Sequence, residues 1–133
     1  MLEAEELRGR FESLDQELFE GRLKNGTVVQ IMEPREGVDL AEDIDGYCRN
    51  DGSEIRINPV AEEWECTLVH EMVHAFEYRF PDDIKVTEEG ELASRRYPAL
   101  FYEKHTAKFF TKLLEVMRAR GHEPEQHFHR YFG

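Results

Sequence analysis

The stretch His70-Glu71-Met72-Val73-His74 spells H-E-x-x-H inside a segment whose neighbours are mostly apolar. Two histidines four positions apart lie on the same face of an α-helix, one turn above the other. Both imidazoles can therefore reach one zinc ion at roughly 2.0–2.1 Å. Glu71 stands beside such a metal, where its carboxylate can take a proton from a bound water. The stretch predicts a helix that carries two metal ligands and a general base.

A chance arrangement of surface side chains is the alternative to a metal site. Most of the flanking residues are apolar, which predicts that the helix is buried; they are Leu68, Val69, Met72, Val73, Ala75 and Phe76. Histidine and glutamate are costly to bury without partners, and a metal ion supplies one. A catalytic zinc takes three protein ligands and leaves its fourth position to water, so a third ligand must come from elsewhere in the chain.

The length and charge of the chain limit the classes of function. A length of 133 residues fits one domain over residues 1–133 with one hydrophobic core. There are 29 acidic and 17 basic residues, which gives a net charge of −12. Nucleic-acid binders concentrate Lys and Arg, so we expect no direct nucleic-acid binding except through a partner or a further segment. The acidity indicates either plain solubility or a preference for basic substrates or partners.

The sequence shows no targeting or membrane segment. The first six residues, Met1-Leu2-Glu3-Ala4-Glu5-Glu6, are acidic, and no apolar run follows them. No stretch approaches the length of a membrane span. We therefore expect an intracellular protein, either cytoplasmic or nuclear. Cys48 and Cys66 form no C-x-x-C pair, and we expect both to be reduced, buried thiols.

Hydrophobic periodicity predicts an α+β domain in which the H-E-x-x-H helix follows a small sheet. We expect a helix over 3–20, a strand over 27–32, a hairpin with arms at 46–49 and 54–58, the H-E-x-x-H helix over 60–79, and a last helix from near 97 or 105 to 120. Residues 82–96 look like a charged loop, and the tail 122–133 has no clear assignment. The prediction is an N-terminal helix, a small antiparallel sheet of about three strands, the active-site helix and a C-terminal helix. The 53–58 strand is a candidate for an exposed sheet edge to which an extended substrate could add.

Two regions compete to supply the third metal ligand. His105 stands near the start of the last helix, where Phe109 can anchor that helix in the core while His105 points back at the metal. Glu89 and Glu91 lie in an acidic stretch closer to His74, and either would give a site of two histidines and one glutamate. A solvated histidine and a solvated acidic run are the plain alternatives.

Several stretches together match the pattern of one known family. Leu18-Phe19-Glu20-Gly21-Arg22-Leu23 reads L-F-x-G-x-L, Gly46-Tyr47-Cys48 is followed by Ile55-Arg56-Ile57-Asn58-Pro59, and Thr67-Leu68-Val69 precedes the H-E-x-x-H. With these stretches most of the chain resembles a SprT-like zinc peptidase domain, the catalytic module also found in Spartan-type proteases of DNA–protein crosslinks. The resemblance implies a zincin-like fold, bound Zn²⁺ and protein or peptide substrates.

The family's third zinc ligand is a histidine in an H-G-x-x-F element. His105-Thr106-Ala107-Lys108-Phe109 matches the histidine and the phenylalanine of that element but has Thr106 in place of the glycine. The spacing from His74 to His105 is also longer than in the family. The resemblance favours His70, His74 and His105 as the zinc ligands, with Glu71 as the general base.

Three functions remain in competition at this point. The first is a zinc-dependent endopeptidase, with DNA-directed proteolysis implied by the resemblance alone. The second is an aminopeptidase-like metallopeptidase with two histidines and a glutamate on the zinc. The third is a non-catalytic, zinc-stabilised interaction module. Glu71 argues against it, because a structural zinc site needs no base. A structural site would also need a fourth protein ligand.

Overall fold

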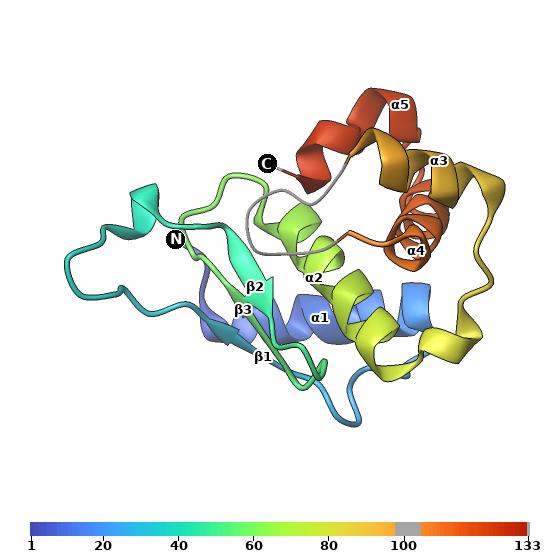
Figure 1. Ribbon diagram of the computed structural model, residues 1–133. Helices are drawn as coiled ribbons and strands as arrows, with labels where there is room; N and C mark the ends of the chain where they lie inside the picture. Colours follow the sequence, from blue (N-terminus) through green and yellow to red (C-terminus); the bar gives the residue numbers. More distant parts are fainter. Residues whose placement is uncertain (98–104, 133) are drawn as a thin grey trace.

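The computed structural model of the chain describes residues 1–97 and 105–132, and its elements follow one another as an α+β fold (Figure 1). The helices are α1 (Ala4–Phe19), α2 (Trp64–Arg79), α3 (Glu88–Arg96), α4 (Ala107–Ala119) and α5 (Pro124–His127). The strands are β1 (Val28–Ile31), β2 (Gly46–Cys48) and β3 (Glu54–Ile57), and single 3-10 turns cover Leu40–Glu42, Pro81–Asp83 and Phe128–Tyr131. The sheet lies on one side of α2, and α3, α4 and α5 lie on the other.

The sheet is mixed, so the prediction of a purely antiparallel sheet is wrong. Its strand order is β1-β3-β2, with β1 parallel to β3 and β2 antiparallel to β3. The predicted hairpin is present, because β2 and β3 pair on either side of a short turn. The long connection after β1 leads the chain to the far edge of the sheet, where β2 runs opposite to β1. The hairpin turn after β2 reverses the chain again, so β3 runs in the same direction as β1.

The strand order also corrects the expected sheet edge. The 53–58 strand corresponds to β3, which has hydrogen-bonded neighbours on both sides and cannot accept a further strand. The edges of the sheet are β1 and β2, and β2 is the edge strand that contacts α2.

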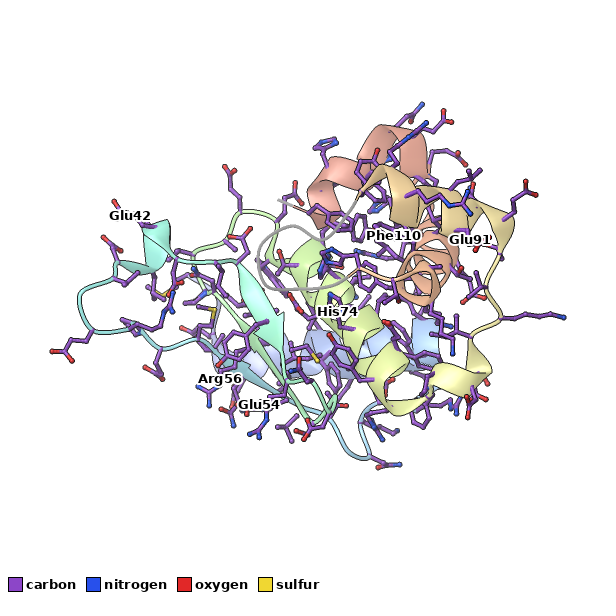
Figure 2. All side chains as sticks on the ribbon, viewed as in Figure 1. Glu42, Glu54, Arg56, His74, Glu91 and Phe110 are labelled. Carbon is purple, nitrogen blue, oxygen red and sulfur yellow. The ribbon has the colours of Figure 1, made fainter. Side chains whose placement is uncertain are left out.

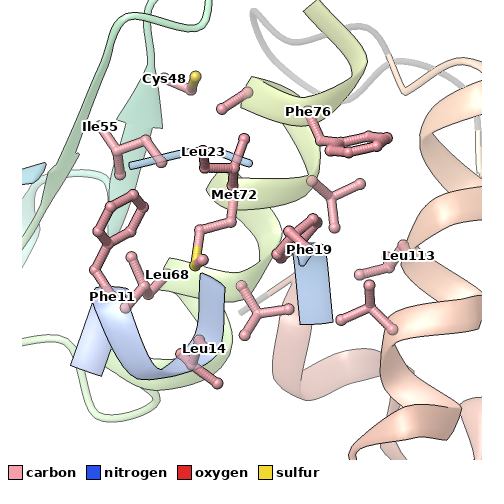
Figure 3. Packing of buried hydrophobic residues seen from close by; sticks show 14 of the residues in the cluster. Phe11, Leu14, Phe19, Leu23, Cys48, Ile55, Leu68, Met72, Phe76 and Leu113 are labelled. Carbon is pink, nitrogen blue, oxygen red and sulfur yellow. The ribbon is translucent and has the colours of Figure 1, made fainter. Parts of the chain in front are cut away.

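One face of the sheet belongs to the hydrophobic core. The register aligns Val29, Ile55 and Cys48 across the three strands, and all three side chains are buried. The opposite face carries the partly exposed Arg56 and the exposed Val28, as the two-residue alternation of a strand requires. Figure 3 shows this core, to which the sheet contributes Cys48 and Ile55, α1 contributes Phe11 and Leu14, and α2 contributes Leu68 and Met72.

Helix α2 is the central element of the fold and is buried on most sides. Every residue from Cys66 to Glu77 is buried, which confirms the burial predicted from the apolar flanks of the H-E-x-x-H. The helix begins at Trp64 rather than near residue 60. The side chain of Asn58 accepts a hydrogen bond from the Val60 amide and donates to two carbonyls of the 40–44 segment, so the chain forms a turn there before it becomes helical.

Helix α3 lies within the segment that the sequence predicts as a charged loop. Thr87 caps it by accepting a hydrogen bond from the Gly90 amide, with acidic residues in the first turn and two arginines in the last. A Cβ on Gly90 would come within 2.0 Å of Thr111 Oγ1, so glycine allows the close packing of α3 on α4. The helix is short and polar, and its packing against α4 has no signature in hydrophobic periodicity.

The last part of the described chain folds back onto α2. Helix α4 begins at Ala107, near the later of the two predicted starts, 97 and 105, and residues 98–104 lie outside the described part. The unassigned tail forms α5 and the 128–131 turn, in which Tyr131 is 2% exposed. In the part of the chain that the structure describes, no helix has the length and apolar character needed to cross a membrane.

Candidate metal centre

Three imidazoles from two parts of the chain converge beside α2. The ring centroids of His70 and His74 are 4.9 Å apart, and the His105 ring lies 5.1 Å from His70 and 5.2 Å from His74. One ligand atom from each ring lies within 4.8 Å of the others. Figure 2 marks His74 on α2, with the sheet on one side and α4 on the other. The structure thus brings together the three histidines that the sequence and the family resemblance favour.

The Nε2 atoms of His70 and His105 are spaced as two ligands of one small cation would be. Nε2 of His105 lies 3.3 Å from Nε2 of His70. Two nitrogens that each lie about 2.05 Å from a tetrahedral zinc are roughly 3.3 Å apart. Imidazole nitrogens are also a donor type that zinc prefers in proteins. The three residues therefore fit Zn²⁺ in chemistry, and the His70–His105 pair also fits it in spacing.

A main-chain carbonyl fixes the orientation of the His70 ring. Nδ1 of His70 lies 2.8 Å from the carbonyl oxygen of Tyr131, and since a carbonyl can only accept, Nδ1 carries the hydrogen. In the neutral ring, Nε2 then keeps its lone pair and faces His105. The sequence gives no sign of this contact, because the acceptor belongs to the main chain.

The side chain of Tyr131 holds that carbonyl in place. Its hydroxyl oxygen lies 2.6 Å from Nδ1 of His122 and accepts a hydrogen bond of 3.0 Å from the Arg120 guanidinium. Burial raises the pKa of Tyr131 to about 12, so the phenol remains protonated at neutral pH. Residues 120–131 therefore act as a support for the first turn of the H-E-x-x-H.

Two phenylalanine rings, Phe109 and Phe132, pack against the imidazoles of the cluster. The Phe109 ring stacks on His74 with centroids 4.2 Å apart and an interplanar angle of 27°, and it lies 5.0 Å from His70 and 4.8 Å from His105. Phe132 meets His70 and His105 edge-on at 4.9 and 5.1 Å. Phe109 is fully buried, in agreement with its predicted role as the anchor of the last helix.

The carboxyl group of Glu71 is positioned by the helix that carries the histidines. Glu71 follows His70 directly on α2 and is 3% exposed. A carboxylate in such a place is costly unless it interacts with a cation or a hydrogen-bond donor. The position is the one that a general base occupies next to a metal-bound water.

A second acidic residue, Glu77, reaches the start of α4. Its two carboxylate oxygens accept hydrogen bonds of 3.0 and 2.9 Å from the Thr106 hydroxyl. Burial raises the pKa of Glu77, and the Thr106 hydroxyl opposes that rise by stabilising the carboxylate. No sequence motif points to this pair of residues. The available signal was that Glu77 lies three positions after His74, and so close to the same helical face, while Thr106 directly follows His105.

The acidic candidates for the third ligand lie in a different environment. Both carboxylate oxygens of Glu89 accept hydrogen bonds from Arg118, at 2.7 and 2.6 Å. The Arg118 guanidinium lowers the pKa of Glu89. Glu91 is exposed on α3, and the cluster of possible ligands contains neither glutamate.

Comparison with known proteins gives no relative for this chain: no family model, no curated protein and no solved structure matches it. The likeness to SprT-like peptidases therefore stays a prediction that depends on the sequence motifs.

Proposed function

We propose that the chain is a zinc-dependent metallopeptidase that hydrolyses peptide bonds in a protein or peptide substrate. The observation that carries the proposal is the convergence of His70, His74 and His105, with Glu71 on the same helix. The charge of −12 argues against direct contact with nucleic acid, so the proposed substrate is polypeptide.

Each residue of the site has a distinct role in this proposal. The three histidines would hold the metal, with His105 Nε2 and His70 Nε2, which lie 3.3 Å apart, as two of the ligand atoms. Bound zinc would lower the pKa of a coordinated water to about 7 and polarise a carbonyl oxygen. Glu71, on the same helix as two of the histidines, would then serve as the general base and return the proton to the leaving amine. Because the cluster holds three ligand residues within the described ranges 1–97 and 105–132, a tetrahedral zinc there would keep one position for water.

Two alternatives receive less support from the geometry. A site with two histidines and Glu89 would require Glu89 to give up its paired hydrogen bonds with Arg118. A structural zinc module would need a fourth protein ligand and no base, whereas the cluster has three histidines beside a buried Glu71.

Metal analysis of purified variants tests the proposal. We expect one zinc per chain in the wild type and in Glu71→Gln, with peptidase activity on an unfolded protein substrate lost only in Glu71→Gln. His105→Ala should lose the metal, while Glu89→Ala and Glu91→Ala should keep it. A wild-type protein that binds no zinc, or a Glu71→Gln protein as active as the wild type, would contradict the proposal.

A further inference from the structure

His105 is the one member of the cluster that does not belong to α2, so its position depends on how the start of α4 is held. Thr106 is the N-cap residue of α4, and its hydroxyl oxygen accepts a hydrogen bond of 3.1 Å from the Phe109 amide. The same hydroxyl donates its proton to Glu77, at 2.9 and 3.0 Å from the two carboxylate oxygens. One hydroxyl therefore starts the helix and ties it to α2.

We propose that Glu77 and Thr106 are positioning residues that hold His105 against His70 and His74 for metal binding. This inference rests on the proposed metal site and names the contact that assembles it. Glu77 lies on α2, one turn after His74, so the helix that carries two of the ligands also fixes the third.

The burial of Glu77 explains why its hydrogen bond with Thr106 can hold the start of α4 in place. Glu77 is 8% exposed, and a buried carboxylate has a strong need for donors. The Thr106 hydroxyl meets that need with a charge-assisted bond, which is about twice as strong as a neutral one. The Glu77 carboxylate therefore fixes the side-chain rotamer of Thr106. Because Thr106 directly follows His105, this also restrains the backbone at His105.

Four single variants and one double variant separate this role from helix capping. Thr106→Val removes both the cap and the contact with Glu77, and Thr106→Ser keeps the hydroxyl. Glu77→Leu leaves the Thr106 cap intact and removes only the contact between the helices. Thr111→Val is the matched control, since Thr111 lies on the same helix and its hydroxyl accepts a hydrogen bond from the Thr87 amide instead.

Zinc affinity is measured by competition with a chromophoric chelator, and the visible absorption of the Co²⁺-substituted protein reports the geometry of the ligands. Changes in groups that orient metal ligands typically cost about 10–100-fold in metal affinity. We expect a loss of that size, with an altered Co²⁺ spectrum, in Thr106→Val and Glu77→Leu. Thr106→Ser keeps the hydroxyl and should bind zinc as tightly as the wild type. Thr111→Val should also have wild-type zinc affinity. The double variant, Thr106→Val with Glu77→Leu, should bind zinc no more weakly than the single variant with the lower affinity, because both substitutions remove the same contact.

Several outcomes would overturn the inference. If Glu77→Leu binds zinc as tightly as the wild type with the same Co²⁺ spectrum, Glu77 does not position His105. If the losses in Thr106→Val and Glu77→Leu add fully in the double variant, the two residues act separately. Both results leave one zinc bound in the wild type, whereas a wild type without zinc defeats the proposed function itself.

Discussion

Phe109 lies between the hydrophobic core and the proposed metal site, and Phe109→Leu tests whether the two are coupled. The ring is fully buried and contacts all three imidazoles, most closely His74 at 4.2 Å between centroids. Leucine fills much of the same volume but has no flat face on which an imidazole can stack. We expect the variant to fold, to be less stable without metal, and to lose a further part of its stability when zinc is present.

The two effects have separate magnitudes. Replacing a buried phenylalanine by leucine leaves a small cavity, which costs about 1–2 kcal/mol of the free energy of unfolding in the apoprotein. Aromatic pairs add about 0.5–1.5 kcal/mol each beyond burial. If the loss of one such contact loosens the imidazoles, zinc affinity falls about tenfold, which corresponds to about 1.4 kcal/mol. The zinc-loaded protein should therefore lose about 2.4–3.4 kcal/mol in total.

Urea unfolding with and without zinc separates these two losses, because the difference between the two free energies of unfolding reports metal binding to the folded state. Phe19→Leu is the matched control. Phe19 is 1% exposed and packs on Phe76 at 5.7 Å between ring centroids, away from the histidines. Phe19→Leu should lower the free energy of unfolding by the same amount with and without zinc. An equal zinc contribution in the two variants would refute the proposed coupling.

Three further predictions concern the frame that supports the site. Asp15→Ala should cost about 3 kcal/mol or more in urea unfolding, because the buried carboxylate accepts two backbone N–H groups at 3.0 Å. Gly90→Ala should lower the melting temperature by overpacking worth at least about 1–3 kcal/mol, since its Cβ would lie 2.0 Å from Thr111 Oγ1; an unchanged melting temperature would contradict the close packing of α3 on α4. Arg118→Ala should cost only about 0.5 kcal/mol at neutral pH, as both partners of its ion pair are about half exposed. The lowered pKa of Glu89 makes this contribution present above the ordinary value of 4.5 and lost as the pH falls through the lowered pKa, so wild type and Arg118→Ala should converge in acid.

Local sequence signals predicted the helices that frame the site. The first helix, predicted over 3–20, runs over Ala4–Phe19. The H-E-x-x-H helix, predicted to end at 79, ends at Arg79. The first helix has a core face that recurs with helical spacing, and the second has apolar residues on most sides. Each also has a signal for where it ends, namely a glycine after the first and a proline after the second. The hairpin was likewise predictable from its short polar turn.

Contacts between distant parts of the chain were not predictable in the same way. The direction of β1 relative to β3 depends on how the long connection between β1 and β2 crosses the sheet, and no residue in β1 encodes it. Helix α3 has few apolar residues, and its stability comes from its cap and from the fit of Gly90 against α4. In both cases the structure is fixed by a partner that is far away in sequence.

The choice of the third ligand shows why motif and spacing left two answers open. Counted along the chain, Glu89 is closer to His74 than His105 is, and a carboxylate is an acceptable zinc ligand. The packing of α3 on α4 instead sets Glu89 against Arg118, which occupies both of its carboxylate oxygens. The start of α4 meanwhile carries His105 to within 3.3 Å of His70, measured between their Nε2 atoms. Helix α4 therefore carries the arginine that binds Glu89, and its start places His105 beside His70. His105 reaches this place although Thr106 replaces the glycine of the family pattern.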